Sequence, residues 1–274
     1  MDEKLQKVLA RRGLGSRREM ERWIDAGRVR VNGKTAKLGD RVSNKDIVQL
    51  DGRTLKKTAE SSVPRVLLYH KPLGEVCSRK DDEGRPTVYD RLPRLTNQRW
   101  ISVGRLDVNT TGLLLFTTDG ELANGLMHPS SKIDREYLVR VNGEVDDSAI
   151  QNLLRGVQLD DGPARFTDIQ EGRGRGDGSN RWFYVALMEG RNREVRRLWE
   201  SQGAKVSRLK RVRFGNVVIP SSVKAGQSKE FSEADIRELY ERVRLPVPAA
   251  IRGKPTKSSR QRSDPSKSAG RQKR

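Results

Sequence analysis

The chain has 274 residues, a net charge of +20 and only 5% aromatic residues, which suits one medium-sized domain and a smaller one. A single cysteine, Cys77, excludes an internal disulfide and a thiolate zinc site, and two histidines, His70 and His128, argue against histidine-based metal chemistry. The N-terminus shows no signal-peptide core and no run approaches membrane-spanning length, so we expect a cytoplasmic protein.

The positive charge is concentrated at the two ends of the chain. Residues 1–60 carry 16 Lys and Arg against 9 Asp and Glu, and residues 249–274 carry 9 against 1, whereas the 188 residues between them contribute only +5. We therefore expect a polyanion that is bound at the ends and presented to the middle. A membrane surface is the weaker alternative, because no basic segment also has a strongly apolar face.

The first 55 residues predict a helix–helix–hairpin module. Leu5, Val8 and Leu9 have helical spacing, and a second helix begins at Ser16 with Glu19 in capping-box position. Residues 28–31 alternate like a strand before an Asn-Gly hairpin turn, and further short strands are expected around residues 42 and 47–50. Residues 51–64 are polar and are predicted to form a linker.

Arg17 and Arg18 occupy the first turn of the second predicted helix, and Arg11, Arg12 and Arg22 are expected to lie nearby. Free N–H groups and guanidinium groups at one helix end make a good phosphate site, although a solvated basic face would look the same. Residues 3–50 resemble the small α-L, or S4-like, RNA-binding module of ribosomal proteins, tyrosyl-tRNA synthetases and RNA-modifying enzymes. This resemblance implies binding to structured RNA and favours the phosphate site.

The next region opens with a predicted strand at residues 66–69 and the sequence HKPLG at 70–74. Its central stretch is a loop, GRLDVNTTG, between a short strand at 100–103 and an apolar run at 113–116 that predicts a strand buried on both faces. Thr118 is expected to cap the helix that follows. Asp107 would thus be held rigidly on a turn with Arg105 beside it, although an Asx-turn would look the same.

The remaining elements are predicted as strands, helices and one hairpin loop: strand 135–141, helix 146–154, loop 171–180, strand 182–188, helix 191–202, strands 211–216 and 217–219, and helix 232–242. In helix 191–202, the apolar side chains Val195, Leu198 and Trp199 are expected to form the buried arc. At about 100° per residue, Arg193 and Arg197 point away from this arc, whereas Arg196 lies at its edge. If one arginine reaches inward, we expect it to be Arg196.

Four separated pieces of the chain carry a common resemblance: HKPLG (70–74), GRLDVNTTGLLLFTTDGELANGLMHP (104–129), REYLV (135–139) and EGRNREVRRLWESQG (189–203). Together with the N-terminal module they resemble the bacterial rRNA pseudouridine synthases of the small-subunit-type branch, and within it the large-subunit enzymes. The resemblance implies an α+β protein with a module at 1–60, a catalytic domain at 61–248 with a mixed, mainly antiparallel sheet and a central cleft, and a disordered basic tail at 249–274.

The resemblance also implies the reaction and its residues. A uridine in 23S rRNA would be flipped out and isomerised to pseudouridine without a cofactor or metal, and Asp107 would be the nucleophile. Arg196 would pair with this carboxylate and keep it ionised, and Tyr137 would stack on the uracil and take its carbon-5 proton. Arg105 would fill the space of the flipped nucleotide, and Lys71 would support the site.

Two other functions remain open from the residues. The chain could be a non-catalytic rRNA-binding assembly factor, although such a protein would be expected to have lost Asp107, Tyr137 or Arg196. It could also be a metal nuclease that uses Asp107 and Asp119, although no further ligands cluster near them. We expect a monomer that binds rRNA and no membrane, and we expect His128 to be structural.

Overall fold

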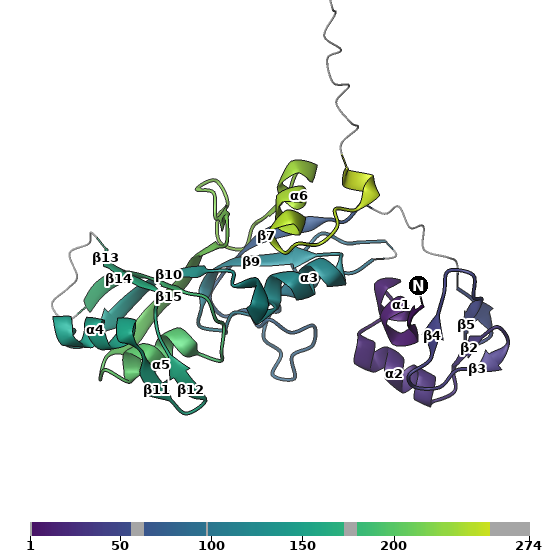
Figure 1. Cartoon of the computed structure of the whole chain (residues 1–274), viewed down its shortest axis with the longest axis horizontal. Helices are drawn as coiled ribbons and strands as arrows, with labels where there is room; N and C mark the ends of the chain where they lie inside the picture. The colour runs from purple at the N-terminus through teal and green to yellow at the C-terminus, as the bar shows by residue number, and fades with distance from the viewer. Residues whose placement is uncertain (1, 56–62, 97, 173–179, 253–274) are drawn as a thin grey trace, which may run out of the picture.

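The fold is given by a computed structural model, which describes all residues except 1, 56–62, 97, 173–179 and 253–274. Figure 1 shows an N-terminal module and a larger second domain that continues to Arg252. Within these described residues, no helix is long and apolar enough to cross a membrane.

The N-terminal module packs two helices, α1 (Leu5–Arg11) and α2 (Arg17–Asp25), against short strands. Its strands are β1 (Glu3–Lys4), β2 (Val29–Val31), β3 (Lys34–Thr35), β4 (Arg41–Val42), β5 (Val48–Leu50) and β6 (Arg53–Thr54). The predicted capping box is confirmed, since Ser16 accepts a hydrogen bond from the N–H of Glu19 and Glu19 accepts one from Ser16. Asn32 and Gly33 both have positive φ, as a two-residue hairpin turn requires.

The second domain is built on a nine-stranded sheet. Its strands are β7 (Val66–Lys71), β8 (Ile101–Val103), β9 (Thr111–Thr117), β10 (Arg135–Asn142), β13 (Asp168–Glu171), β14 (Asn180–Leu187), β15 (Lys205–Phe214), β16 (Val217–Val218) and β17 (Ser228–Glu230). The main order is β13-β14-β10-β15-β9-β7-β17, with β8 paired to β9 and β16 to β15. Only the β9–β15 pair is parallel, so the predicted mixed, mainly antiparallel sheet is confirmed.

Four helices and one small hairpin complete the second domain: α3 (Gly120–Met127), α4 (Asp147–Arg155), α5 (Glu194–Glu200), α6 (Glu233–Arg242), and the pair β11 (Val157–Leu159) and β12 (Gly162–Ala164). Helices α4 and α5 lie beside β10, β14 and β15, whereas α3 and α6 lie beside β7 and β9 (Figure 1). Each group of helices covers its own hydrophobic cluster. Strand β9 belongs to both clusters, because Leu114 and Phe116 enter one and Leu113 and Leu115 the other. The predicted burial on both faces is therefore confirmed.

The sheet consists of two halves that meet at a very short contact. Strand β15 pairs with β9 only through Lys210 with Thr111 and Arg211 with Gly112, and further along the same edge β9 pairs with β8. Gly112 has a φ of 107°, and a Cβ atom on it would lie 2.2 Å from the carbonyl oxygen of Arg211. Only glycine allows the two halves to approach so closely.

Three sequence predictions need correction. Asp119, not Thr118, caps α3, because its side chain accepts the N–H of Glu121 at 2.7 Å, while the Thr118 hydroxyl accepts the N–H of Arg65 at 3.0 Å. The predicted linker begins later than residue 51, because β6 pairs with β5. The tail predicted from residue 249 also begins later, because Ala249–Ile251 form a 3-10 helix with a buried Ile251. The rest of that predicted tail lies outside the described residues.

The Gly112 contact generates a prediction about stability. We expect Gly112→Ala to lower the free energy of unfolding by roughly 2–4 kcal/mol, since it adds a backbone clash to the cost of a positive φ. Gly104→Ala is the matched control, because Gly104 also has a positive φ of 76° but nothing lies within 4 Å of its added Cβ. Urea unfolding would measure both variants, and equal losses would contradict a close approach at Gly112.

Candidate active site

Asp107 lies on the loop that joins β8 to β9, just before the two halves of the sheet meet. The N–H of Thr110 donates to the Asp107 carbonyl at 3.0 Å and closes the turn. The Asp107 side chain is half-buried. Among the described residues, no hydrogen bond or ion pair reaches its carboxylate. A rigid turn therefore holds a carboxylate whose oxygens are free to react.

Lys71 holds this loop by donating to backbone carbonyls. It ends β7, its exposed fraction is 0%, and its ammonium donates to the carbonyls of Thr110 at 2.9 Å, Pro72 at 3.0 Å and Val108 at 3.4 Å. The N–H of Gly74 also donates to the Val108 carbonyl, at 2.9 Å. Burial lowers the pKa of Lys71, and the nearby charge of Asp107 acts in the opposite direction. The HKPLG turn thus fixes the backbone that follows Asp107.

Arg196 supports the same loop from the α5 side. Its exposed fraction is 6%, which confirms that this arginine of the helix reaches inward. Its two Nη atoms donate at 2.9 Å to the carbonyls of Asn109 and Val206. The expected direct pairing with Asp107 is wrong in this structure, because both Nη atoms are engaged by backbone oxygens. The two side chains interact through their charges: burial lowers the pKa of Arg196, and Asp107 opposes this shift.

Tyr137 and Arg105 were also expected at the site. Tyr137 lies on β10 in register with Arg211 of β15, which is itself in register with Gly112 of β9. Its exposed fraction is 8%, and it belongs to the same hydrophobic cluster as Leu106 of the Asp107 loop. Arg105 is exposed and makes no hydrogen bond or ion pair within the described part of the chain. The sheet register therefore connects Tyr137 to the start of β9, whereas Arg105 stands at the surface beside Asp107.

The sequence did not identify two side chains near the loop, the buried Arg211 and the half-buried Cys77. Arg211 is 3% exposed, its Nε donates to the Leu113 carbonyl at 2.7 Å, and its Nη2 is buried without a partner. Cys77 accepts the N–H of Leu106 at 3.4 Å through its sulfur, and burial raises the pKa of its thiol. The sequence could not identify Arg211 as the buried arginine of its strand, because basic residues recur throughout Lys205–Phe214.

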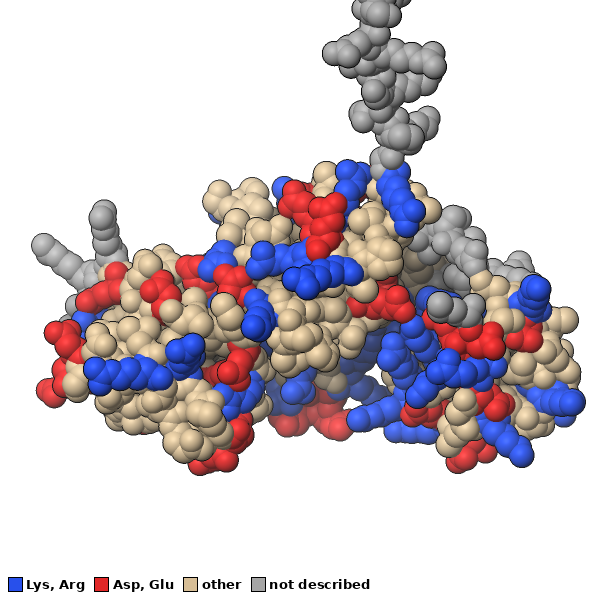
Figure 2. All heavy atoms as spheres, in the orientation of Figure 1, with Lys and Arg blue, Asp and Glu red and all other residues tan. Residues whose placement is uncertain are grey.

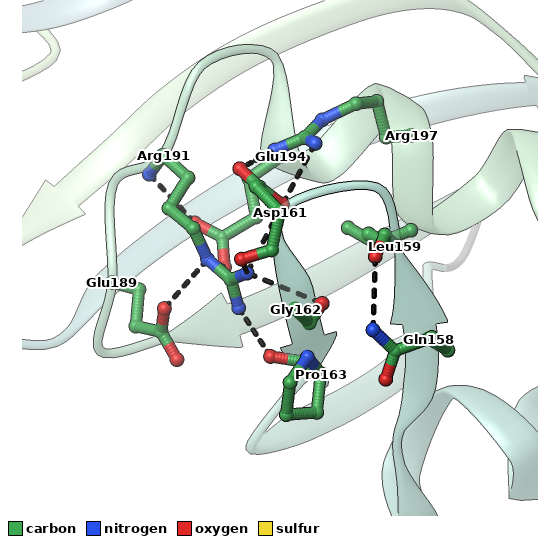
Figure 3. Close-up of polar contacts among 9 residues, drawn as sticks. All are labelled: Gln158, Leu159, Asp161, Gly162, Pro163, Glu189, Arg191, Glu194 and Arg197. Carbon is green, nitrogen blue, oxygen red and sulfur yellow. Dashed lines mark hydrogen bonds and ion pairs between the residues drawn. The ribbon is translucent and has the colours of Figure 1, made fainter.

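An ion-pair network holds α5, and with it Arg196, against the β11–β12 hairpin (Figure 3). Asp161 of the hairpin pairs with Arg191 at 3.1 Å and with Arg197 at 2.8 Å. Glu194 accepts the backbone N–H of Arg191 at 2.9 Å, and burial raises the pKa of Glu194. Because α5 has no side-chain cap at its first turn, these contacts fix the start of the helix instead.

The four arginines of the N-terminal module have different environments. Arg11 pairs with Glu3 at 2.7 Å. Arg12 is half-buried, and its Nε and Nη1 are buried without partners. Arg17 and Arg18 are exposed at the start of α2. These residues therefore do not form one uniform basic face, since Arg11 is neutralised and Arg12 is left without an anion.

Two alternatives from the sequence can be judged from the geometry. Asp107 and Asp119 lie beyond opposite ends of β9, whose seven residues span about 20 Å, so they cannot share a metal ion. Asp119 is also engaged by the Tyr240 hydroxyl. Within the described residues, no group of three or more His, Cys, Asp and Glu could hold a metal ion. His128 caps the 3-10 helix Pro129–Ser131, which confirms a structural role.

Comparisons with known proteins agree with this architecture. Residues 65–201 match the family described as RNA pseudouridylate synthase, and residues 3–48 match the S4 domain. The chain is 60% identical over 257 residues to Ribosomal large subunit pseudouridine synthase B of Pseudomonas aeruginosa, an alignment that covers 93% of this chain and 66% of that protein. It is 58% identical over 250 residues to the protein of the same name in Escherichia coli (strain K12), with 90% and 85% covered.

A solved structure described as a pseudouridylate synthase gives the same result for the fold. It is 26% identical, has a TM-score of 0.59, and the match covers 86% of this chain and 99% of that one. The second domain and the N-terminal module thus both correspond to known domains. From its family match and its curated relatives, the chain belongs to the RNA pseudouridylate synthase family and carries an N-terminal S4 domain.

Proposed function

We propose that this enzyme isomerises one uridine of 23S rRNA to pseudouridine and that Asp107 is its nucleophile. The observation that carries the proposal is a free carboxylate on a loop whose next three carbonyls are bound by two buried cations, Lys71 and Arg196. The names of its relatives support a large-subunit target. The protein acts as a monomer in the cytoplasm, which its lone, unpaired Cys77 suits.

The reaction makes few demands on the protein. The bond between the ribose and uracil nitrogen 1 breaks, the uracil rotates, a new bond forms to carbon 5, carbon 5 loses its proton and nitrogen 1 gains one. Asp107 forms a covalent adduct that keeps the intermediate bound, and attack on either the ribose or the uracil ring satisfies this balance. Tyr137 stacks on the loose uracil and takes the carbon-5 proton, while Arg105 fills the space of the flipped nucleotide.

Lys71 and Arg196 are positioning residues in this mechanism. They bind the carbonyls of Val108, Asn109 and Thr110, so the turn presents Asp107 in one orientation. Their positive charges also attract the carboxylate of Asp107. Because both cations are buried, their charges are poorly screened by solvent, and the stabilisation is larger than it would be at the surface.

The nucleophile role of Asp107 can be tested in cells. A strain that lacks this protein should lose pseudouridine at one 23S rRNA site, and Asp107→Asn should fail to restore it, with activity reduced on the order of 10³-fold or more. The amide keeps the shape of the carboxylate but is not a nucleophile. Mapping pseudouridine in 23S rRNA measures the result, and Asp160→Asn, a change at an exposed aspartate, should restore the site fully.

Two results would count against the proposal. If Asp107→Asn restored the site as well as the wild type, Asp107 would not be the nucleophile. If the deletion strain lost no site, the protein would be better described as a non-catalytic rRNA-binding assembly factor.

Another prediction concerns Arg196. Arg196→Lys keeps the charge but cannot reach both carbonyls, so we expect kcat to fall by roughly 10–100-fold while the affinity for rRNA changes less than about 2-fold. Arg193→Lys is the matched control, because Arg193 is an exposed arginine at the start of the same helix. Single-turnover kinetics at saturating rRNA measure the chemical step, and an unchanged rate in Arg196→Lys would refute the positioning role.

A further inference from the structure

A hollow of about 650 Å³ lies between the N-terminal module and the second domain, and Asp107 is not among its lining residues. One wall comes from α1 and the start of α2, and the other from the chain around β8 and the start of α3. Lys7 and Glu121 bridge the two walls with an ion pair of 2.5 Å. We call this hollow the interdomain cleft. Figure 2 shows Lys and Arg side chains gathered where the module faces the second domain.

The acidic side chains of the interdomain cleft already have partners. Glu3 pairs with Lys7 at 3.0 Å and with Arg11 at 2.7 Å. Glu121 is the carboxylate that pairs with Lys7 across the cleft. Asp119 accepts the N–H of Glu121 at the start of α3. Two of these three carboxylates, Glu3 and Glu121, are therefore already paired with cations.

Three arginines of the same cleft have no such partner. Arg12 and Arg17 come from the module and Arg99 from the second domain. Among the described residues, none of the three makes a hydrogen bond or an ion pair through its side chain. The Nε and Nη1 of Arg12 and the Nε of Arg99 are buried without any hydrogen-bond partner. Buried guanidinium groups without an acceptor are costly, so an anion in the cleft would be strongly favoured.

The charges around Arg99 also favour an anion in the cleft. Burial lowers the pKa of Arg99, and the nearby charges of Arg79 and Arg17 lower it further, while Tyr89 and Glu19 act in the opposite direction. Arg79 is held close by because its guanidinium donates to the Trp100 carbonyl and lies 4.3 Å from the centre of the Tyr89 ring. Like charges from the two domains are thus held together with few counter-charges. A ligand with negative oxygens would relieve this repulsion.

We propose that the interdomain cleft binds the phosphodiester backbone of the RNA substrate, with Arg12 and Arg17 on one side and Arg99 on the other. Guanidinium groups bind phosphate oxygens in pairs, and the cleft offers them from both domains. A fully extended chain from Arg99 to Asp107 spans at most about 29 Å. One RNA strand could therefore reach both places. This inference rests on the proposed function, because it assumes an RNA substrate.

Bound RNA would also help to hold the two domains together. Lys7 and Glu121 already join the two walls by an ion pair, and bound phosphates would add to what holds the module against the second domain. The RNA would then orient the module as it binds. The module would contribute affinity and also placement of the target uridine at Asp107.

The test uses the full chain and three variants: Arg12→Gln, Arg99→Gln and the double variant. The matched control is Arg155→Gln, because Arg155 is an exposed arginine at the end of α4. Filter binding to a 23S rRNA transcript would be measured over a range of KCl concentrations. We expect each cleft variant to reduce the slope of log affinity against log salt by about 1, because one phosphate contact is lost. Affinity at moderate salt should fall about 5–20-fold in each single variant and further in the double one, while Arg155→Gln should bind like wild type.

A structural role for these arginines predicts a different pattern. Removing one of several crowded cations relieves repulsion, so we expect the Tm of RNA-free Arg99→Gln to stay equal to that of wild type or to rise. A variant that merely unfolded would lose Tm and affinity together. Unchanged RNA affinity and salt slope in both single variants would overturn the proposal.

The source of the phosphate is tested with inorganic pyrophosphate as a probe. If pyrophosphate raised the Tm of wild type but not of Arg99→Gln, and RNA affinity were the same in both, the cleft would be a small-anion site and the proposal would be wrong. Failure of the inference is separable from failure of the proposed function. Arg99→Gln should still convert uridine at saturating RNA, whereas Asp107→Asn should bind RNA normally and convert none.

Discussion

The site depends on the binding of backbone carbonyls by two buried cations. A lysine at the end of β7 and an arginine on α5 come from distant parts of the chain, yet they bind consecutive carbonyls of the turn that follows Asp107. Buried ammonium and guanidinium groups need acceptors, and buried carbonyls need donors, so each group satisfies the other. The arrangement orients the turn without using the carboxylate itself. Among the described residues, the Asp107 carboxylate is thereby left without a hydrogen bond while two positive charges lie near it, which suits the nucleophile role that we propose for it.

The division of the sheet into two halves explains the position of the loop between β8 and β9. If β15 paired with β9 along its whole length, the start of β9 would be covered by a neighbouring strand. Instead the two strands share only two residue pairs, and β8 takes over the same edge further along. The loop between β8 and β9 therefore emerges at the junction of the two halves. Gly112 makes the junction possible, because any side chain there would meet the backbone of Arg211. The position of the loop thus follows from the strand pairing.

Local signals in the sequence were sufficient for much of the fold. The capping box at Ser16, the Asn-Gly turn and the inward direction of Arg196 depend on neighbours within a few residues, and all three are as expected. The failures have non-local causes. Thr118 and Asp119 offer adjacent side-chain oxygens, and the choice between them is made by Arg65, whose N–H takes the Thr118 hydroxyl from 53 residues away. Arg211 becomes notable only because β15 meets β9, and the interdomain cleft exists only because the module packs beside α3. No periodicity within one segment encodes such contacts.

The internal ion pairs determine how much of the positive charge of the chain remains for binding a polyanion. The second domain is rich in arginine, but many of its arginines are paired with acids that fix the scaffold, as Asp161 does for α5 and as Asp134 and Glu136 do for Arg213 of β15. Such paired arginines add little to the field that a polyanion meets. Arg12, Arg17 and Arg99, which have no acidic partner among the described residues, face one cleft. For RNA recognition, the informative quantity is therefore the positive charge left over after internal pairing. Part of this remainder lies between the module and the catalytic domain, where a bound strand would connect the two.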